Sequence, residues 1–188
     1  LAADESTGTM TKRLENVKVQ SSPENRLLFR KTLFTSDSMK DCIGGVILYD
    51  ETIKQSNKSG KKIPELISDF NSVPGIKVDT GAKVLANSNE EKITEGLDGL
   101  RERLKEYYKL GARFTKWRAV YLISNKYPSK LSIKSNSHAL ARYSALAQEC
   151  GMVPIVEPEV LMDGDHSADD CYKKTSEVIK NCFDELES

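Results

Sequence analysis

The sequence predicts an α/β fold built on a parallel sheet, and two observations support this class. Short runs of β-branched and apolar residues recur about every 30 to 40 residues, which is roughly the length of one βαβ crossover. Segments with apolar residues at three- and four-residue spacing lie between these runs. Strands that alternate with helices in this way favour a parallel sheet covered by helices.

The predicted strands share an enrichment in β-branched and apolar residues: Ile43–Asp50, Gly75–Thr80, Arg113–Val120 and Met152–Val160. The segment Leu1–Gly8 is expected to begin as a strand of small residues that runs into a turn and then into a helix near Thr11. The other predicted helices share a helical apolar period: Glu24–Phe34, Leu97–Leu110, Ser135–Cys150 and Ala168–Leu186. Ser56–Lys62 and Asn87–Glu91 are expected to be polar loops.

A doubly wound sheet and a (β/α)8 barrel both satisfy this alternation, and charges inside the strands decide between them. The buried strands of a doubly wound sheet are nearly continuous apolar runs. Here alternate positions place charged pairs on one face of a strand: Lys77 with Asp79, Lys116 with Arg118, and Glu157 with Glu159. Barrel active sites collect such residues at the C-terminal ends of the strands, pointing into a common lumen. The sequence therefore predicts a barrel.

Length and composition narrow the class of protein. The 188 residues fit a single domain, 1–188. Lys+Arg and Asp+Glu both number 28, so no global field would attract nucleic acid or an acidic membrane surface. The four cysteines form no CxxC pair or dense framework, which favours a reducing, cytoplasmic setting. No apolar run is long enough for membrane insertion.

Lys116 lies beside Phe114 and Trp117, and a lysine in a partly desolvated strand position can have a lowered pKa that frees its amine. It would then be a nucleophile or an acid/base group; the alternative is a lysine whose amine reaches water from a strand end. Glu157 and Glu159 are like charges on one face, which raises the pKa of one of them unless cations balance them. The alternative interpretation is that Glu157 and Glu159 lie in a solvated loop and have no function in a site.

Four other candidate site residues each have an alternative, purely structural interpretation. Asp4, at a strand end, could bind a sugar hydroxyl or an ammonium, or it could be a helix N-cap. Lys12, Arg13 and Arg26 could pair with a phosphate, or they could be ordinary surface charges. The isolated histidines, the scattered cysteines and the turn Asp163–Asp165 indicate no metal site.

The chain resembles class I fructose-1,6-bisphosphate aldolase, the metal-independent Schiff-base family, from end to end. The matching segments are LAADESTG from Leu1, KRL from Lys12, ENR from Glu24, CIGGVIL from Cys42, GIKVD from Gly75, GLDGL from Gly96, KWR from Lys116, LARY from Leu140, PIVEPE from Pro154 and DGDH from Asp163. This many matching segments in the same order make the resemblance to this family highly specific. The resemblance implies a TIM barrel, of which about five of the eight βα units are present.

The resemblance also implies the reaction and the role of each residue. Fructose 1,6-bisphosphate would be cleaved reversibly to dihydroxyacetone phosphate and glyceraldehyde 3-phosphate in glycolysis, with no cofactor. Asp4 would position the carbinolamine and the C4 hydroxyl, Glu157 would be the main acid/base, and Glu159 and Lys116 would support proton transfer. The residues that would hold the substrate and its phosphates are Lys77, Arg118, Ser6, Thr9, Lys12, Arg13 and Arg26. Thr9 stands where many relatives have serine.

One departure changes the expected role of Lys116. The Schiff-base lysine of the family follows Ser188, on a strand that this chain does not reach, so the resemblance makes Lys116 a supporting residue. We expect a chain truncated at both ends, inactive alone, from a homotetrameric enzyme with cytoskeletal partners. Two alternatives remain open: a noncatalytic scaffold or interaction protein derived from an aldolase, and another lysine-dependent aldolase or a transaldolase on the same barrel.

Overall fold

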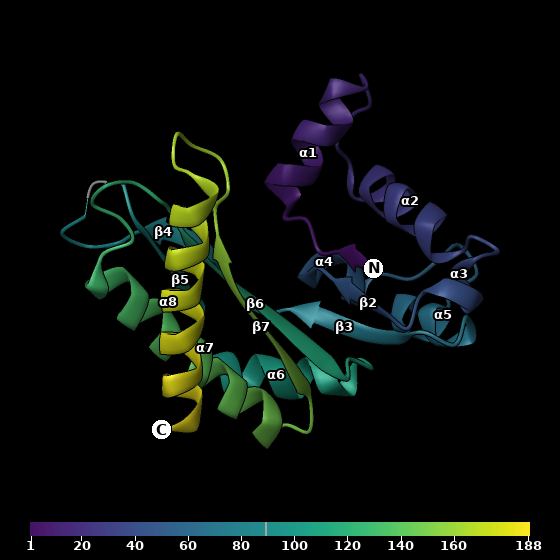
Figure 1. Cartoon of the computed structure of the whole chain (residues 1–188). Coiled ribbons are helices and arrows are strands. Elements are labelled where there is room, and N and C mark those ends of the chain that lie inside the picture. The colour runs from purple at the N-terminus through teal and green to yellow at the C-terminus, as the bar shows by residue number, and fades with distance from the viewer. Residues whose placement is uncertain (89) are drawn as a thin grey trace. The chain divides into compact units, whose positions relative to one another are not determined.

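The computed structural model describes residues 1–88 and 90–188, and the chain divides into two compact units (Figure 1). Unit 1 comprises Leu1–Lys77 and Lys105–Thr115, and unit 2 comprises Val78–Leu104 and Lys116–Ser188. One boundary falls inside strand β6, Phe114–Tyr121, so that each unit contains a part of this strand. The single domain expected from the chain length stays a prediction.

The main sheet has the strand order β1-β2-β3-β6-β7. Its strands are β1 Ala2–Ala3, β2 Gly45–Leu48, β3 Val73–Lys77, β6 Phe114–Tyr121 and β7 Val153–Val160. β1 pairs in parallel with β2, and β2 pairs in parallel with β3. Each of these strands overlaps a strand predicted from the sequence, and the boundaries of β2, β3, β6 and β7 differ from the predicted ones by no more than three residues.

Unit 1 carries most of the short helices. They are α1 Thr7–Asn16, α2 Pro23–Phe34, α3 Met39–Cys42, α4 Asp50–Lys54 and α5 Ile63–Asp69. Serine side chains start the two longer ones: Ser6 Oγ accepts the amide of Thr9 at 3.3 Å, and Ser22 Oγ accepts the amide of Asn25 at 3.2 Å. The helices α1 and α2 were predicted, whereas α3, α4 and α5 are too short to show a clear apolar period.

Unit 2 contains the long helices and a small hairpin. Its elements are the hairpin strands β4 Gly81–Val84 and β5 Lys92–Glu95, the first half of α6 Leu100–Lys109, α7 Lys130–Glu149 and α8 Ala168–Glu187. The helix α7 begins five residues before the predicted Ser135, because Ser129 Oγ caps it by accepting the amide of Ser132 at 3.1 Å. A capping box between Ser167 and Asp170 starts α8 at its predicted residue.

The antiparallel hairpin β4–β5 was not predicted from the sequence. It is held by distant residues: the amide of Thr94 donates to Asn136 Oδ1 at 3.1 Å, and Thr94 Oγ1 donates to the carbonyl of Arg118 at 2.8 Å. A local period cannot reveal contacts of this kind. The predicted polar loop Asn87–Glu91 lies between the two strands, except that residue 89 lies outside the described residues.

The strand β6 has one buried face, as its alternation predicts. Thr115, Trp117 and Ala119 are fully buried, while the intervening Lys116 is half-buried and Arg118 is exposed. The ring of Trp117 stacks on Tyr143 of α7, with ring centroids 5.4 Å apart and an interplanar angle of 22°. This contact fixes which face of β6 lies against the helix.

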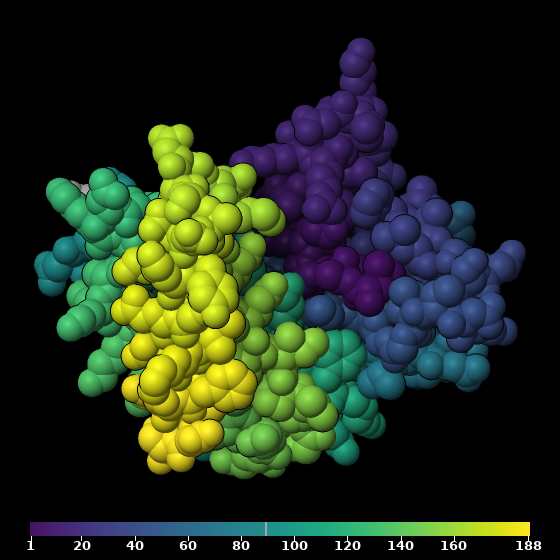
Figure 2. Space-filling model, viewed as in Figure 1, coloured from purple at the N-terminus to yellow at the C-terminus, as the bar shows by residue number. Residues whose placement is uncertain are grey.

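Apolar side chains also remain at the surface of unit 2. Figure 2 shows α8 in yellow, exposed along its length, and Tyr172 and Phe183 of this helix are exposed. On β7, Val153 and Ile155 are exposed on the strand face that also carries Glu157. No helix within residues 1–88 and 90–188 is both long and apolar enough to cross a membrane.

A glycine in β3 allows one close approach within unit 1. A Cβ atom built on Gly75 would lie 2.3 Å from the ring of Phe114, which is closer than any real contact. Gly44, in the same unit, has open space at the corresponding position. Packing of Phe114 against the sheet therefore requires glycine at position 75.

We predict that Gly75→Ala, in the protein expressed from its complete natural gene, lowers the free energy of unfolding by about 1–3 kcal/mol, because the added methyl forces Phe114 out of place. The matched control Gly44→Ala should change it by less than about 0.5 kcal/mol. Urea denaturation measures both values. Equal effects of the two substitutions would contradict the proposed packing.

Candidate active site

Neighbouring strands of unit 2 bring the predicted lysine, arginine and glutamates together. Lys116 and Arg118 come from β6, and Glu157 and Glu159 come from β7. The Nζ atom of Lys116 lies 3.1 Å from Glu157 Oε2, and Arg118 Nε donates to Glu159 Oε2. The alternating positions on each strand thus pair across to the next strand, one cation with one carboxylate.

The two pairs differ in exposure. The side chains of Lys116 and Glu157 are 13% and 35% exposed, and those of Arg118 and Glu159 are 44% and 37% exposed. The hydrogen bond to Glu159 raises the pKa of Arg118, an effect that burial opposes. The two carboxylates are thus about equally exposed, and the first pair is the more enclosed one because its cation, Lys116, is mostly buried.

Asp79 joins this cluster through the main chain. Its carboxylate accepts the amide of Arg118 at 3.4 Å and the amide of Gly81 at 3.0 Å. Asp79 is buried, at 8% exposed, two residues after the end of β3. It therefore links the start of the β4–β5 hairpin to the strand that carries Lys116 and Arg118.

The other predicted site residues belong to unit 1. Asp4 is buried at the end of β1, and Lys77 is half-buried at the end of β3. Ser6, and not Asp4, is the N-cap of α1, so the alternative reading of Asp4 as a cap is wrong. Ser6 Oγ also contacts Thr9 Oγ1 at 3.1 Å, which places these two hydroxyls together at the start of the helix.

The cations of unit 1 do not form one cluster. Lys12 and Arg13 are exposed on α1, and Arg13 Nη1 donates to Glu5 Oε1 at 2.5 Å. Arg26 of α2 is buried and binds Glu51 of α4 with two nitrogens, Nε to Oε2 at 2.9 Å and Nη2 to Oε1 at 2.5 Å. The alternative that Arg26 is an ordinary surface charge is therefore wrong, because its guanidinium is buried in an ion pair with Glu51.

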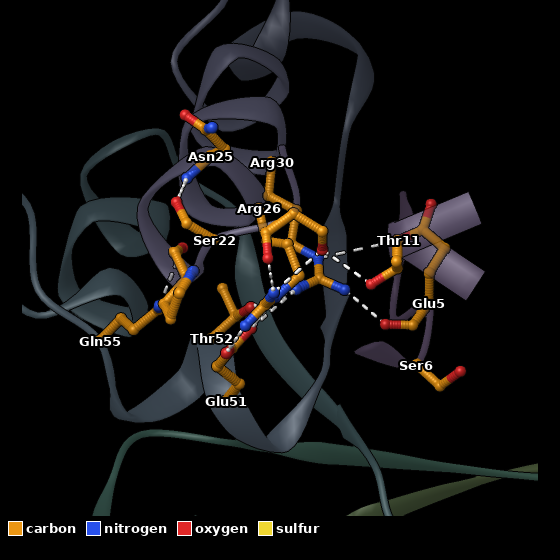
Figure 3. A network of polar contacts seen from close by, with 12 residues as sticks. Glu5, Ser6, Thr11, Ser22, Asn25, Arg26, Arg30, Glu51, Thr52 and Gln55 are labelled. Atoms are coloured by element: carbon orange, nitrogen blue, oxygen red, sulfur yellow. Dashed lines mark hydrogen bonds and ion pairs between the residues drawn. The ribbon is translucent and has the colours of Figure 1, made fainter. Parts of the chain in front are cut away.

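Figure 3 shows the polar network around Arg26, where a second arginine of α2, Arg30, lies beside it. Arg30 is fully buried between Glu5 and Glu51, with its Nη1 donating to Thr52 Oγ1 at 2.8 Å. Sequence reasoning missed these partners. The sequence did contain one signal, the four-residue spacing of Arg26, Arg30 and Phe34, which places them on one side of a helix; the structure shows that this side is buried.

Histidines and cysteines contribute no metal site among the described residues. No group of three or more His, Cys, Asp or Glu side chains within residues 1–88 and 90–188 is arranged to hold a metal ion. His138 instead lies with Nδ1 2.9 Å from Glu185 Oε2, on the contact between α7 and α8.

The strand order β1-β2-β3-β6-β7, with a lysine–carboxylate pair and an arginine–carboxylate pair between β6 and β7, is consistent with part of an α/β barrel. The family model described as class I fructose-bisphosphate aldolase matches residues 1–188. The chain belongs to this family, and the predicted TIM-barrel class is confirmed.

Named relatives agree with the family model. The chain is 51% identical, over 186 residues, to the probable fructose-bisphosphate aldolase class 1 of Xanthomonas campestris pv. campestris, covering 99% of this chain and 56% of that protein. It is 50% identical to fructose-bisphosphate aldolase C of Carassius auratus, covering 99% of this chain and 52% of that protein. The chain spans about half the length of the curated relatives it matches.

A solved structure is similar in fold as well. Fructose-bisphosphate aldolase from Plasmodium falciparum, in a ternary co-crystal with TRAP and a small-molecule inhibitor, superposes with a TM-score of 0.96 at 46% identity. The match covers 99% of this chain and 54% of that one. The chain therefore shares its fold with a solved aldolase.

The ion pair of Glu51 with Arg26 makes stability depend on pH. The hydrogen bond from Arg26 holds the pKa of Glu51 below its ordinary value of 4.5, against the opposing effect of burial. A carboxyl with a lowered folded pKa stabilises the fold fully above its unfolded pKa, and this contribution is lost as the pH falls through the folded pKa.

We predict that Glu51→Gln flattens the acid side of the stability profile. Between about pH 7 and about pH 3, the variant should lose about 0.5–2 kcal/mol less unfolding free energy than the wild type, because it has no carboxylate to protonate. Urea titrations at each pH measure the difference. The exposed Glu65→Gln is the control, and a profile of Glu51→Gln that parallels the wild type would exclude this role of the pair.

Proposed function

We propose that this protein is a glycolytic class I fructose-bisphosphate aldolase. It cleaves fructose 1,6-bisphosphate reversibly to dihydroxyacetone phosphate and glyceraldehyde 3-phosphate. The observation that carries the proposal is the enclosed contact of Lys116 with Glu157, at 3.1 Å, in a chain that belongs to the aldolase family over its whole length. An ammonium beside a carboxylate can share and move the protons of a carbonyl reaction.

In this proposal Glu157 is the main general acid/base, and Lys116 balances its charge. Glu159 and Arg118 form the adjoining wall of the site, where Glu159 supports proton transfer and Arg118 holds substrate. Asp4 positions the C4 hydroxyl. The remaining residues of the proposed substrate and phosphate region are Ser6, Thr9, Lys12, Arg13, Arg26 and Lys77.

The nucleophile of the proposed reaction is a Schiff-base lysine that follows Ser188 in the complete protein. Lys116 is a weaker candidate because Glu157 holds its ammonium in an ion pair, which favours the charged and non-nucleophilic form. This chain spans about half the length of its relatives. We propose that the nucleophilic lysine lies in the part of the complete protein that corresponds to the rest of their length. The residues of this chain then hold the substrate and move protons.

We predict that borohydride with dihydroxyacetone phosphate adds covalent mass to the protein expressed from its complete natural gene. Peptide mapping should place the adduct on a lysine after Ser188, because reduction traps only an imine. The same treatment of Lys116→Ala should still give the adduct. An adduct on Lys116 itself would overturn the assignment of the nucleophile.

We also predict that Lys116→Ala lowers kcat for fructose 1,6-bisphosphate by about 100-fold or more, because Glu157 loses the cation that balances it during proton transfer. The exposed Lys134→Ala on α7 is the matched control and should keep kcat within about twofold. A steady-state cleavage assay measures both. Full activity of Lys116→Ala would remove the lysine from the mechanism.

A role in protein–protein interaction is the second candidate function. One observation favours it: the solved Plasmodium falciparum aldolase is in complex with TRAP. We propose on this basis that the complete protein also binds protein partners, including cytoskeletal ones, as a cytoplasmic homotetramer. Absence of both cleavage and borohydride trapping would leave the noncatalytic scaffold as the better reading.

A further inference from the structure

Arg30 is an unusual residue in unit 1 because a fully buried arginine is rare and costly to desolvate. Burial lowers the pKa of Arg30, and the charges of Glu5, Glu51 and Asp4 oppose that shift. The side chain therefore lies in an acidic environment that keeps it charged. Replacing a buried ion pair by apolar side chains of similar volume is often neutral for stability, so the main consequence of this arginine is geometric.

The three nitrogens of Arg30 hold two different segments of unit 1 (Figure 3). Its Nη1 donates to Thr52 Oγ1 of α4, and its Nη2 donates to the main-chain carbonyl of Glu5. Its Nε lies 3.8 Å from Glu5 Oε2. Glu5, in the turn between β1 and α1, is thus held at both its backbone and its carboxylate.

Glu5 in turn holds Arg13. Its second carboxylate oxygen, Oε1, accepts Nη1 of Arg13 at 2.5 Å, and the side chain of Arg13 is 55% exposed while that of Glu5 is 13% exposed. A guanidinium carries donors on all of its nitrogens, and this pair engages Nη1. Glu5 therefore sets the direction of an exposed arginine that can bind an anion with its other edge.

We propose that Arg30 is a positioning residue for the substrate-binding turn: it fixes Glu5, and through Glu5 it orients Arg13 toward a sugar phosphate. The same contact fixes the peptide that follows Asp4, since Glu5 is the next residue in the chain. The inference rests on the proposed function, which makes the anion a phosphate of the substrate. It adds Arg30 and Glu5 to the residues on which that function depends.

The test uses the protein expressed from its complete natural gene and two variants. Arg30→Lys keeps the charge but loses the forked contacts, because an ammonium cannot reach Thr52 and both groups of Glu5 together. Glu5→Gln keeps the size of the side chain but weakens the hold on Arg13. Both should lower kcat/KM for fructose 1,6-bisphosphate, and weaken the binding of inorganic phosphate, by about tenfold to a hundredfold.

A double-mutant cycle separates positioning from general stability. If Arg30 acts through Arg13, adding Arg30→Lys to Arg13→Gln lowers phosphate binding by less than about twofold further. Multiplying effects would overturn the proposal, as would phosphate binding unchanged in both Arg30→Lys and Glu5→Gln. Arg113→Lys is the control, because Arg113 is an exposed arginine of the same unit that also donates to main-chain carbonyls.

Phosphate binding and cleavage of fructose 1,6-bisphosphate are measured in separate experiments. The proposed aldolase function and the positioning role of Arg30 can therefore be refuted independently. A wild type that binds inorganic phosphate but does not cleave fructose 1,6-bisphosphate would refute the proposed function, while the phosphate titrations of the variants still decide the role of Arg30. A wild type that cleaves the sugar while Arg30→Lys matches it in kcat/KM and phosphate binding would refute the inference alone.

Discussion

The two-sided character of β6 is the constraint on which the rest of unit 2 depends. Trp117 is fully buried and stacks on Tyr143 of α7, so the residues on either side of it, Lys116 and Arg118, must lie on the opposite face. A slip of one residue would put both cations against the helix and the indole in water. The desolvation of two charges would oppose that slip strongly, and the register of β6 therefore sets the position of the candidate site.

Charged side chains are paired locally in both units. The chain has equal numbers of acidic and basic residues, and the structure shows how some of them match: Lys116 with Glu157, Arg118 with Glu159, and Arg26 with Glu51. Each pair joins a cation and a carboxylate from different strands or helices. Acidic and basic side chains are thereby balanced locally within each unit, in a chain whose formal net charge is zero.

Much of the secondary structure could be predicted from local patterns, and the exceptions share a cause. The strands around Ile47, Ile76, Trp117 and Ile155 have clear apolar or alternating patterns, and all are present. The start of α7 was placed too late because the capping serine, Ser129, lies outside the apolar period. The β4–β5 hairpin was missed because Asn136 and the carbonyl of Arg118 hold it, and these lie far away in sequence.

By itself, the sequence determined which residues could share a strand face, and its matching segments, in the same order as in the family's sequence pattern, identified the family. Only the tertiary structure decided the partners: Ser6 and not Asp4 caps α1, Arg26 binds Glu51, and Arg30 lies buried against Glu5. The physical reason is that an apolar pattern with a period of two or 3.6 residues tells only on which face of its own strand or helix a side chain lies. An ion pair depends on the distance between elements that the chain separates by tens of residues, and only folding sets that distance.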